Sequence, residues 1–207
     1  MVARSDKRSC VLLCVTGCIA AYKSCEITRL LQKAGFRVKV LMTEHATRFV
    51  GPTTFRALTG EKVAIGLFDE PEDPIHHISL AQEADLVLVA PATANILAKM
   101  ASGIADDLMS TTLLATRAPV LVAPAMNTAM WEAAATQENV ATLRSRGVRF
   151  VLPVDGRLAC GDCGSGKLAP VEVIAEEASS LLRGTTMLSG RSVVVTAGGT
   201  QEPIDPV

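Results

Sequence analysis

Aromatic residues are scarce in this chain: phenylalanine, tryptophan and tyrosine together make up 3% of its 207 residues. Apolar residues nevertheless account for 49% of the chain, so we expect a buried core of aliphatic side chains, which excludes a disordered protein. At roughly 100–200 residues per domain, the length allows one full domain, or one domain plus a fragment of a second.

An excess of charge of either sign is also lacking. The chain has 20 lysines and arginines against 21 aspartates and glutamates, and its formal net charge is −1. The basic residues are scattered and form no cluster that would bind nucleic acid. No apolar run approaches the ~20 residues that cross a bilayer. We therefore expect neither nucleic acid nor a membrane as a partner.

The first residues imitate a secretion signal. Residues 1–18 combine a basic start, a short apolar run and V-T-G-C, which is also the form of a lipoprotein signal peptide that ends at Cys18. The run is short for a signal, and its removal would delete the first strand of a regular β/α alternation. We interpret residues 10–16 as that strand and expect a cytoplasmic protein.

The six cysteines form no recognisable disulfide or metal pattern. Most of them lie within residues 10–25, too close together for a disulfide framework, so we expect free thiols in a reducing compartment. Cys160 and Cys163 form a C-x-x-C, but the chain has no second such pair, and its three histidines do not stand at a matching spacing. The sequence predicts no metal site.

Apolar and amphipathic segments alternate along the chain. We expect strands at residues 10–16, 36–42, 85–90, 119–123 and 148–152, and helices at about 20–34, 94–102, 106–116, 128–146 and 171–182. Continuous aliphatic strands need cover on both faces, which predicts an α/β fold: a doubly wound parallel sheet of the Rossmann or flavodoxin-like type. Ligands of such sheets bind at the carboxyl ends of the strands.

Two regions interrupt this alternation. Residues 154–169 are rich in glycine and carry two cysteines, which favours a mobile flap over a plain linker. Near the end, residues 189–207 begin a new apolar strand and a glycine turn, with no helix after them. We expect residues 1–188 to form one domain and residues 189–207 to be the truncated start of another.

Three segments follow predicted strands at the edge where ligands bind. The first opens a helix at Gly17, where free backbone N–H groups suit a phosphate, although a plain β–α turn explains the segment equally well. Its single glycine falls short of the G-x-G-x-x-G fingerprint, which argues against NAD. The others are P-A-T-A-N, which ends at Asn95, and P-A-M-N, which ends at Asn127. A single asparagine there is usually a helix cap, whereas two equivalent segments indicate a site whose small residues admit a flat ring.

Together with other segments, these motifs resemble the flavin-dependent cysteine decarboxylases. The matching segments run from about residue 9 to 183 and are G-C-I-A-A-Y-K, M-T-E-H-A, H-I-S-L, A-D-L-V-L-V-A-P-A-T-A-N, G-I-A-D-D-L, P-A-M-N-x-x-M-W and A-C-G-D-x-G-x-G. The pair P-A-M-N and A-C-G-D resembles the branch that converts 4′-phospho-N-pantothenoylcysteine to 4′-phosphopantetheine in coenzyme A biosynthesis. Residues 196–207 resemble the opening of a phosphopantothenate–cysteine ligase, which bacteria fuse behind this decarboxylase. Ligase activity, with its CTP and Mg²⁺, would belong to the full-length bifunctional protein alone.

The resemblance implies FMN as the cofactor and a role for each matched residue. In this family, FMN oxidises the thiol carbon of the substrate to a thioaldehyde, CO₂ leaves to give an enethiolate, and reduced flavin returns the hydride. His77 would be the base, although a histidine near a helix start is also a common cap or surface residue. Asn127 would hold the substrate carboxylate, and Cys160 on the flap would protonate the enethiolate. FMN would lie against Gly17, Cys18, Ile19, Thr43, Ala92, Thr93, Ala94, Asn95 and Ala125.

The family also implies self-association, and it includes proteins with other functions. Its members form trimers with FMN at the subunit boundaries, and the fused bacterial proteins assemble these trimers into dodecamers. Other functions to weigh are oxidative decarboxylation of a peptide's C-terminal cysteine, flavin prenyl transfer, electron transfer by a flavodoxin-like carrier, and a non-enzymatic phosphatase-regulating role. The regulatory relatives tend to carry long acidic tails, which this near-neutral chain lacks.

Overall fold

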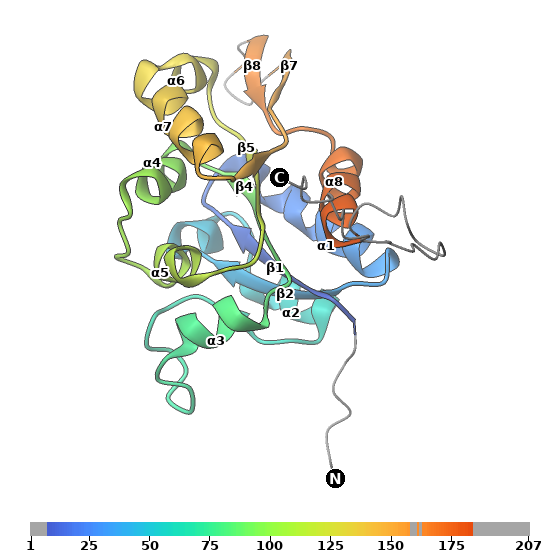
Figure 1. Cartoon of the computed structure of the whole chain (residues 1–207). Helices are drawn as coiled ribbons and strands as arrows, with labels where there is room; N and C mark the ends of the chain where they lie inside the picture. Colours follow the sequence, from blue (N-terminus) through green and yellow to red (C-terminus); the bar gives the residue numbers. More distant parts are fainter. Residues whose placement is uncertain (1–7, 158–160, 162, 184–207) are drawn as a thin grey trace, which may run out of the picture.

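The computed structural model describes residues 8–157, 161 and 163–183, and its centre is a parallel sheet (Figure 1). The strands are β1 (Cys10–Val15), β2 (Arg37–Met42), β3 (Val63–Ala64), β4 (Leu86–Ala92), β5 (Val120–Pro124) and β6 (Arg149–Phe150). They pair in the order β3-β2-β1-β4-β5-β6. This order confirms the predicted doubly wound fold, and it reverses between β1 and β4, where such sheets bind ligands.

Helices cover both faces of the sheet. They are α1 (Lys23–Lys33), α2 (Pro52–Thr59), α3 (His76–Glu83), α4 (Ala94–Ser102), α5 (Leu108–Ala115), α6 (Thr128–Glu132), α7 (Ala134–Ser145) and α8 (Val171–Arg183). Figure 1 shows α1 and α8 to the right of the sheet and α4, α5 and α7 to its left. None of the helices in the described residues has both the length and the apolar character that a membrane span requires.

Each face of the sheet has its own aliphatic core. Strand β1 is buried along its whole length, and its successive side chains point to opposite faces. Leu13 belongs to the cluster under α1 and α8, whereas Leu12 belongs to the cluster under α4 and α7. Burial raises the pKa of the Cys14 thiol far above its ordinary value, so this thiol stays protonated. The cysteines in the described part of the chain are free, as expected.

The structure departs from the sequence-based elements in three places. The helix expected from residue 20 begins as a 3-10 turn, η1 (Ile19–Tyr22), before α1. The single helix expected at 128–146 is interrupted at Ala133, whose ψ of 132° cannot continue a helix. The glycine-rich segment forms an antiparallel hairpin of β7 (Val154–Arg157) and β8 (Cys163–Lys167). The proposed start of a second domain lies outside the described residues.

The side chain of Thr16 joins β1 to β4 where the strand order reverses. The register between β4 and β5 shifts near the end of β4, and side chains satisfy two carbonyl groups at this point. The Thr16 hydroxyl donates to the carbonyl oxygen of Pro91 at 2.7 Å and accepts from the N–H of Thr93 at 3.1 Å. The hydroxyl of Ser24 donates to the carbonyl oxygen of Ala90 at 2.8 Å. Both hydroxyl residues are fully buried, so water cannot replace these hydrogen bonds.

Replacing Thr16 with valine keeps the shape of the side chain but leaves the N–H of Thr93 without its partner. A buried group that loses its hydrogen bond costs about 1–3 kcal/mol, so we expect T16V to lower the free energy of unfolding by about that amount. Urea denaturation measures this change, with Thr16→Ser as the control because serine keeps the hydroxyl. A T16V protein as stable as the wild type would contradict the role assigned to Thr16.

Candidate functional site

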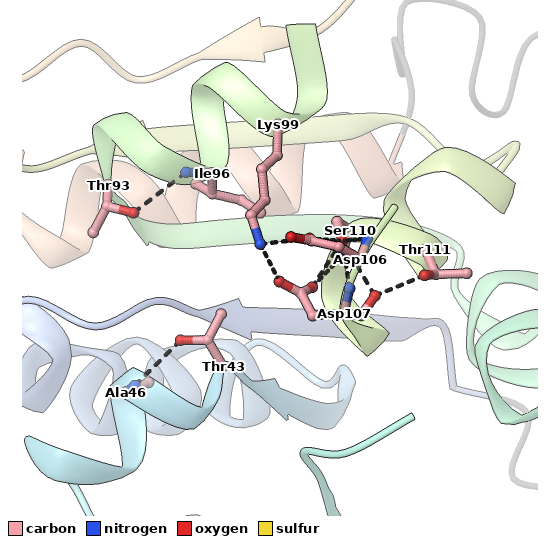
Figure 2. Close-up of polar contacts among 9 residues, drawn as sticks. All are labelled: Thr43, Ala46, Thr93, Ile96, Lys99, Asp106, Asp107, Ser110 and Thr111. Carbon is pink, nitrogen blue, oxygen red and sulfur yellow. Dashed lines mark hydrogen bonds and ion pairs between the residues drawn. The ribbon is translucent and has the colours of Figure 1, made fainter. Parts of the chain in front are cut away.

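Three residues with extended backbones start the helices at the carboxyl edge of the sheet. Thr43 follows β2, Thr93 follows β4 and Asn127 follows β5. Each side chain accepts a hydrogen bond from a backbone N–H of its own helix: Ala46 at 3.2 Å, Ile96 at 3.4 Å and Ala129 at 2.9 Å. Figure 2 shows the caps at Thr43 and Thr93 on facing sides of this edge. Helix N-termini carry partial positive charge, so the edge favours an anionic or electron-rich ligand.

Gly17, at the end of β1, allows two turns to pack closely. An added Cβ at this position would lie 2.6 Å from the Cβ of His45 and 2.8 Å from its carbonyl carbon. His45 belongs to η2 (Glu44–Arg48), the 3-10 helix that Thr43 caps. Any larger residue at position 17 would therefore displace the segment that follows β2.

Two cavities open at this edge and share Gly17, Thr93, Ala94 and Met130. The smaller has a volume of about 480 Å³ and lies between the segment after β5 and the β7–β8 hairpin. The larger has a volume of about 980 Å³ and extends from η2 across α4 to the start of α5. We call them the hairpin cavity and the helix cavity.

Most of the predicted flavin contacts line one or both of these cavities. Those at the hairpin cavity are Gly17, Cys18, Ile19, Thr93, Ala94 and Ala125, and those at the helix cavity are Gly17, Thr43, Thr93, Ala94 and Asn95. Ala92 lines neither cavity because it is fully buried in β4, where its carbonyl oxygen accepts the N–H of Ala125 at 3.0 Å. Asn127 lines the hairpin cavity, so the fold brings the predicted substrate ligand to the predicted flavin residues.

Cys18 directly precedes η1 and lines the hairpin cavity. Burial raises the pKa of its thiol, and backbone N–H groups of Ala20 and Ala21 offset only part of this effect. The thiol therefore stays neutral at the wall of the hairpin cavity.

The two predicted catalytic residues are not among the described residues that line these cavities. His77 lies half-buried on α3 and lines neither. In Figure 1, α3 is at the opposite end of the molecule from the β7–β8 hairpin. Cys160 lies outside the described residues. Among the described residues, no three or more His, Cys, Asp or Glu side chains lie together in a way that could hold a metal ion.

Lys99 lines the helix cavity and lies outside the motifs that the sequence singles out. The Lys99 ammonium lies 2.6 Å from a carboxylate oxygen of Asp106 and 2.6 Å from one of Asp107 (Figure 2). Asp107 also caps α5 by accepting the N–H of Ser110 at 2.7 Å. This cluster ties α4 to the start of α5 and so shapes one end of the cavity. The sequence does contain a signal for Lys99. It stands four residues after Asn95, so the two side chains lie on the same face of α4.

The Lys99 cluster also sets the pKa of its carboxylates. Burial acts to raise the pKa of Asp107, but hydrogen bonds from Lys99 and Ser110 outweigh it and hold the pKa below its ordinary value of 3.8. Burial likewise acts to lower the pKa of Lys99, and its bonds to Asp106 and Asp107 raise it further than burial lowers it. Both groups are therefore charged at neutral pH.

The fold and these cavities define a doubly wound α/β protein with an open site where the strand order reverses. Residues 2–183 match the sequence model of the family described as Flavoprotein. The chain belongs to this family.

Similar proteins include bifunctional enzymes and solved decarboxylases. The chain is 52% identical over 202 residues to the coenzyme A biosynthesis bifunctional protein CoaBC of Mycobacterium tuberculosis, and 50% identical over 200 residues to that of Bacillus subtilis. These matches cover 95% of this chain but 48% and 49% of the relatives, so the chain spans about half their length.

In contrast, the chain matches nearly the whole length of similar solved structures. A mutant PPC decarboxylase in complex with pantothenoylaminoethenethiol matches with a TM-score of 0.73 and 29% identity, over 83% of this chain and 96% of that one. The FMN-dependent cysteine decarboxylase SpaF matches with a TM-score of 0.72 and 31% identity, over 83% of this chain and 98% of that one.

The lowered pKa of Asp107 predicts a dependence of stability on pH. Its carboxylate stabilises the folded chain above the unfolded pKa of about 3.9, and this contribution is lost as the pH falls through the lower folded pKa. We expect Asp107→Asn to be less stable than the wild type at neutral pH, with the difference shrinking below pH ~4. Urea denaturation between acidic and neutral pH measures it, and a difference that stays constant over this range would contradict the assignment.

Proposed function

We propose that this chain decarboxylates 4′-phospho-N-pantothenoylcysteine to 4′-phosphopantetheine with FMN as its cofactor, as a cytoplasmic step of coenzyme A biosynthesis. The observation that carries the proposal is the position of Asn127 in the hairpin cavity, beside residues of the flavin motifs. The names of the similar proteins support the same substrate, since they include CoaBC enzymes and a PPC decarboxylase with a pantothenoyl ligand.

The edge of the sheet fits FMN. Ala94 and Ala125 are small, which leaves room for a flat ring, and the starts of η2 and α4 present backbone N–H groups for polar oxygens. Gly17–Ile19, Thr43, Thr93–Asn95 and Ala125 would hold the cofactor. When bound, FMN would supply the oxidation of the thiol carbon, which creates a C=S group that accepts the electron pair left behind by CO₂, and later the return of the hydride.

The chain's own residues position the substrate and move its protons. The Oδ1 of Asn127 accepts the N–H of Ala129 at 2.9 Å, which orients the amide, and its Nδ2 is a hydrogen-bond donor suited to the substrate carboxylate. His77 would accept a proton during oxidative decarboxylation. Cys160 would donate a proton to the enethiolate that remains after CO₂ leaves.

We further propose that the chain works as a trimer. In a single chain, His77 is not at the cavity that holds Asn127, so a neighbouring copy would have to supply it. Large apolar side chains around both cavities are well exposed, which favours cover by another copy: Ile19 (61%), Tyr22 (60%), Phe49 (48%) and Met130 (49%).

The direct test is mass spectrometry of 4′-phospho-N-pantothenoylcysteine after incubation with the purified, FMN-loaded chain. We expect loss of CO₂, and we expect Asn127→Asp to abolish it while flavin absorbance is retained, because a second carboxylate repels the substrate. A flavin-bound wild type that leaves the substrate intact would contradict the proposal. Conversion of a peptide with a C-terminal cysteine instead would identify the peptidyl-cysteine reaction.

Mixed assemblies test the contribution of His77 from a neighbouring copy. His77→Asn and Asn127→Asp should each be inactive alone. In trimers that contain both variants at random, a site that takes Asn127 from one copy and His77 from the next is intact in about a quarter of cases. We expect about that fraction of wild-type activity after co-expression. Mixtures as inactive as the single variants would show that each site uses its own chain's histidine, and a fully active His77→Asn variant on its own would show that His77 has no catalytic role.

A further inference from the structure

The hairpin cavity has a one-sided charge. Lys23, Arg157 and Lys167 line it, and the described residues at its wall include no carboxylate. The helix cavity is mixed, with Glu44, Asp69, Asp106 and Asp107 alongside Arg48 and Lys99. Cations without opposing acids in a concave site concentrate a positive potential. The hairpin cavity is therefore suited to a ligand that carries more than one negative charge.

Two of these cations lie on the two strands of the hairpin. Arg157 is on β7 and pairs with Cys163, whereas Lys167 is on β8 and pairs with Val154. At about 3.3 Å per residue, the length of β7 separates these two pairs by roughly 10 Å. The cations thus line the cavity from different points along the hairpin, and long, flexible side chains reach from there toward a common ligand.

The hairpin is held in place against the segment that carries Asn127. The N–H of Met126 donates to the carbonyl oxygen of Gly166 at 2.9 Å. An added Cβ on Gly166 would lie 2.4 Å from the carbonyl oxygen of Met126, so the two backbones are in close contact. Lys167, the next residue, is therefore fixed near the proposed carboxylate ligand.

A second glycine makes space for the lysine side chain. An added Cβ on Gly156 would lie 3.0 Å from the Cδ of Lys167 and 3.4 Å from its Nζ. The ammonium consequently folds back over β7, toward the strand that carries Arg157. Both cations belong to one structural unit, the hairpin, which is separate from the strand ends that would hold the flavin.

Of the two anionic groups on the proposed substrate, the phosphate matches this pair. The carboxylate has a partner in Asn127, whereas the phosphate is a dianion at the far end of a long arm. Arginine and lysine side chains are strong donors to phosphate oxygens. We propose that Arg157 and Lys167 bind the phosphate of the substrate and so select phosphorylated over unphosphorylated pantothenoylcysteine. This inference rests on the proposed function, because it takes the substrate from it.

The test compares ligands that differ only in the phosphate. Titration calorimetry on the FMN-loaded chain gives the Kd of 4′-phosphopantetheine and of pantetheine, and kinetics give kcat/KM for the corresponding cysteine substrates. We expect Arg157→Gln and Lys167→Met each to weaken binding of the phosphorylated ligand about 10-fold or more, because a charged hydrogen bond is lost. The unphosphorylated ligand should change less than about twofold.

Matched controls separate a local effect from a general loss of charge. Lys33→Met removes a lysine at the other end of α1 from Lys23, away from both cavities, and should leave all constants unchanged. Lys167→Arg keeps the charge and should retain most of the discrimination. A fluorescence titration of FMN should give the same Kd for every variant.

Three results would overturn the inference. Equal losses for both ligands would assign the cations to a group other than the phosphate, such as the substrate carboxylate in the kinetic comparison. Weaker FMN binding would assign them to the flavin phosphate, and unchanged constants would leave them no role. Failure of the proposed function looks different: the wild type would discriminate between 4′-phosphopantetheine and pantetheine yet decarboxylate neither cysteine substrate.

Discussion

The buried hydroxyl of Thr16 connects the two strands between which the sheet order reverses, and the candidate site is built around this connection. It accepts the N–H of Thr93 and donates to the carbonyl of Pro91, which also accepts the backbone N–H of Thr16, so it reinforces the pairing near the end of β4. The position of Thr93 sets the start of α4, and Ala94 and Asn95 at that start line the cavities. A single satisfied polar group in an aliphatic core thereby positions much of the proposed flavin site.

The uncharged and the charged groups that line the candidate site come from different parts of the fold. The strand ends present helix N-termini and small side chains, which suit a flat ring and its polar oxygens. The charges come from elements added to that edge: the β7–β8 hairpin contributes cations to one cavity, and the Lys99 cluster contributes one cation and two carboxylates to the other. This division would let the proposed cofactor and substrate, both anionic, bind close together without competing for the same donors.

Within the described residues, a single chain does not bring together the residues that would carry out the proposed proton transfers. Asn127 stands at the cavity wall, whereas His77 lies on α3, at the opposite end of the molecule from the hairpin (Figure 1). In a monomer, the exposed apolar side chains around the cavities would stay in contact with water, which is unfavourable. Association of several copies would bury them and, in the same step, bring a histidine to each site.

Local patterns in the sequence determined the strands β1, β4 and β5, the helix at Ala94–Ser102 and the strand-end positions of Asn95 and Asn127, because burial periodicity and cap residues act over a few neighbouring positions. They did not reveal the interruption at Ala133 or the β7–β8 hairpin, where backbone geometry and pairing override composition. Only the tertiary structure showed that Thr16 bonds to Thr93, that Lys99 meets Asp107 and that His77 lies apart from Asn127. These are relations between segments distant along the chain, and their geometry depends on how the whole sheet is wound.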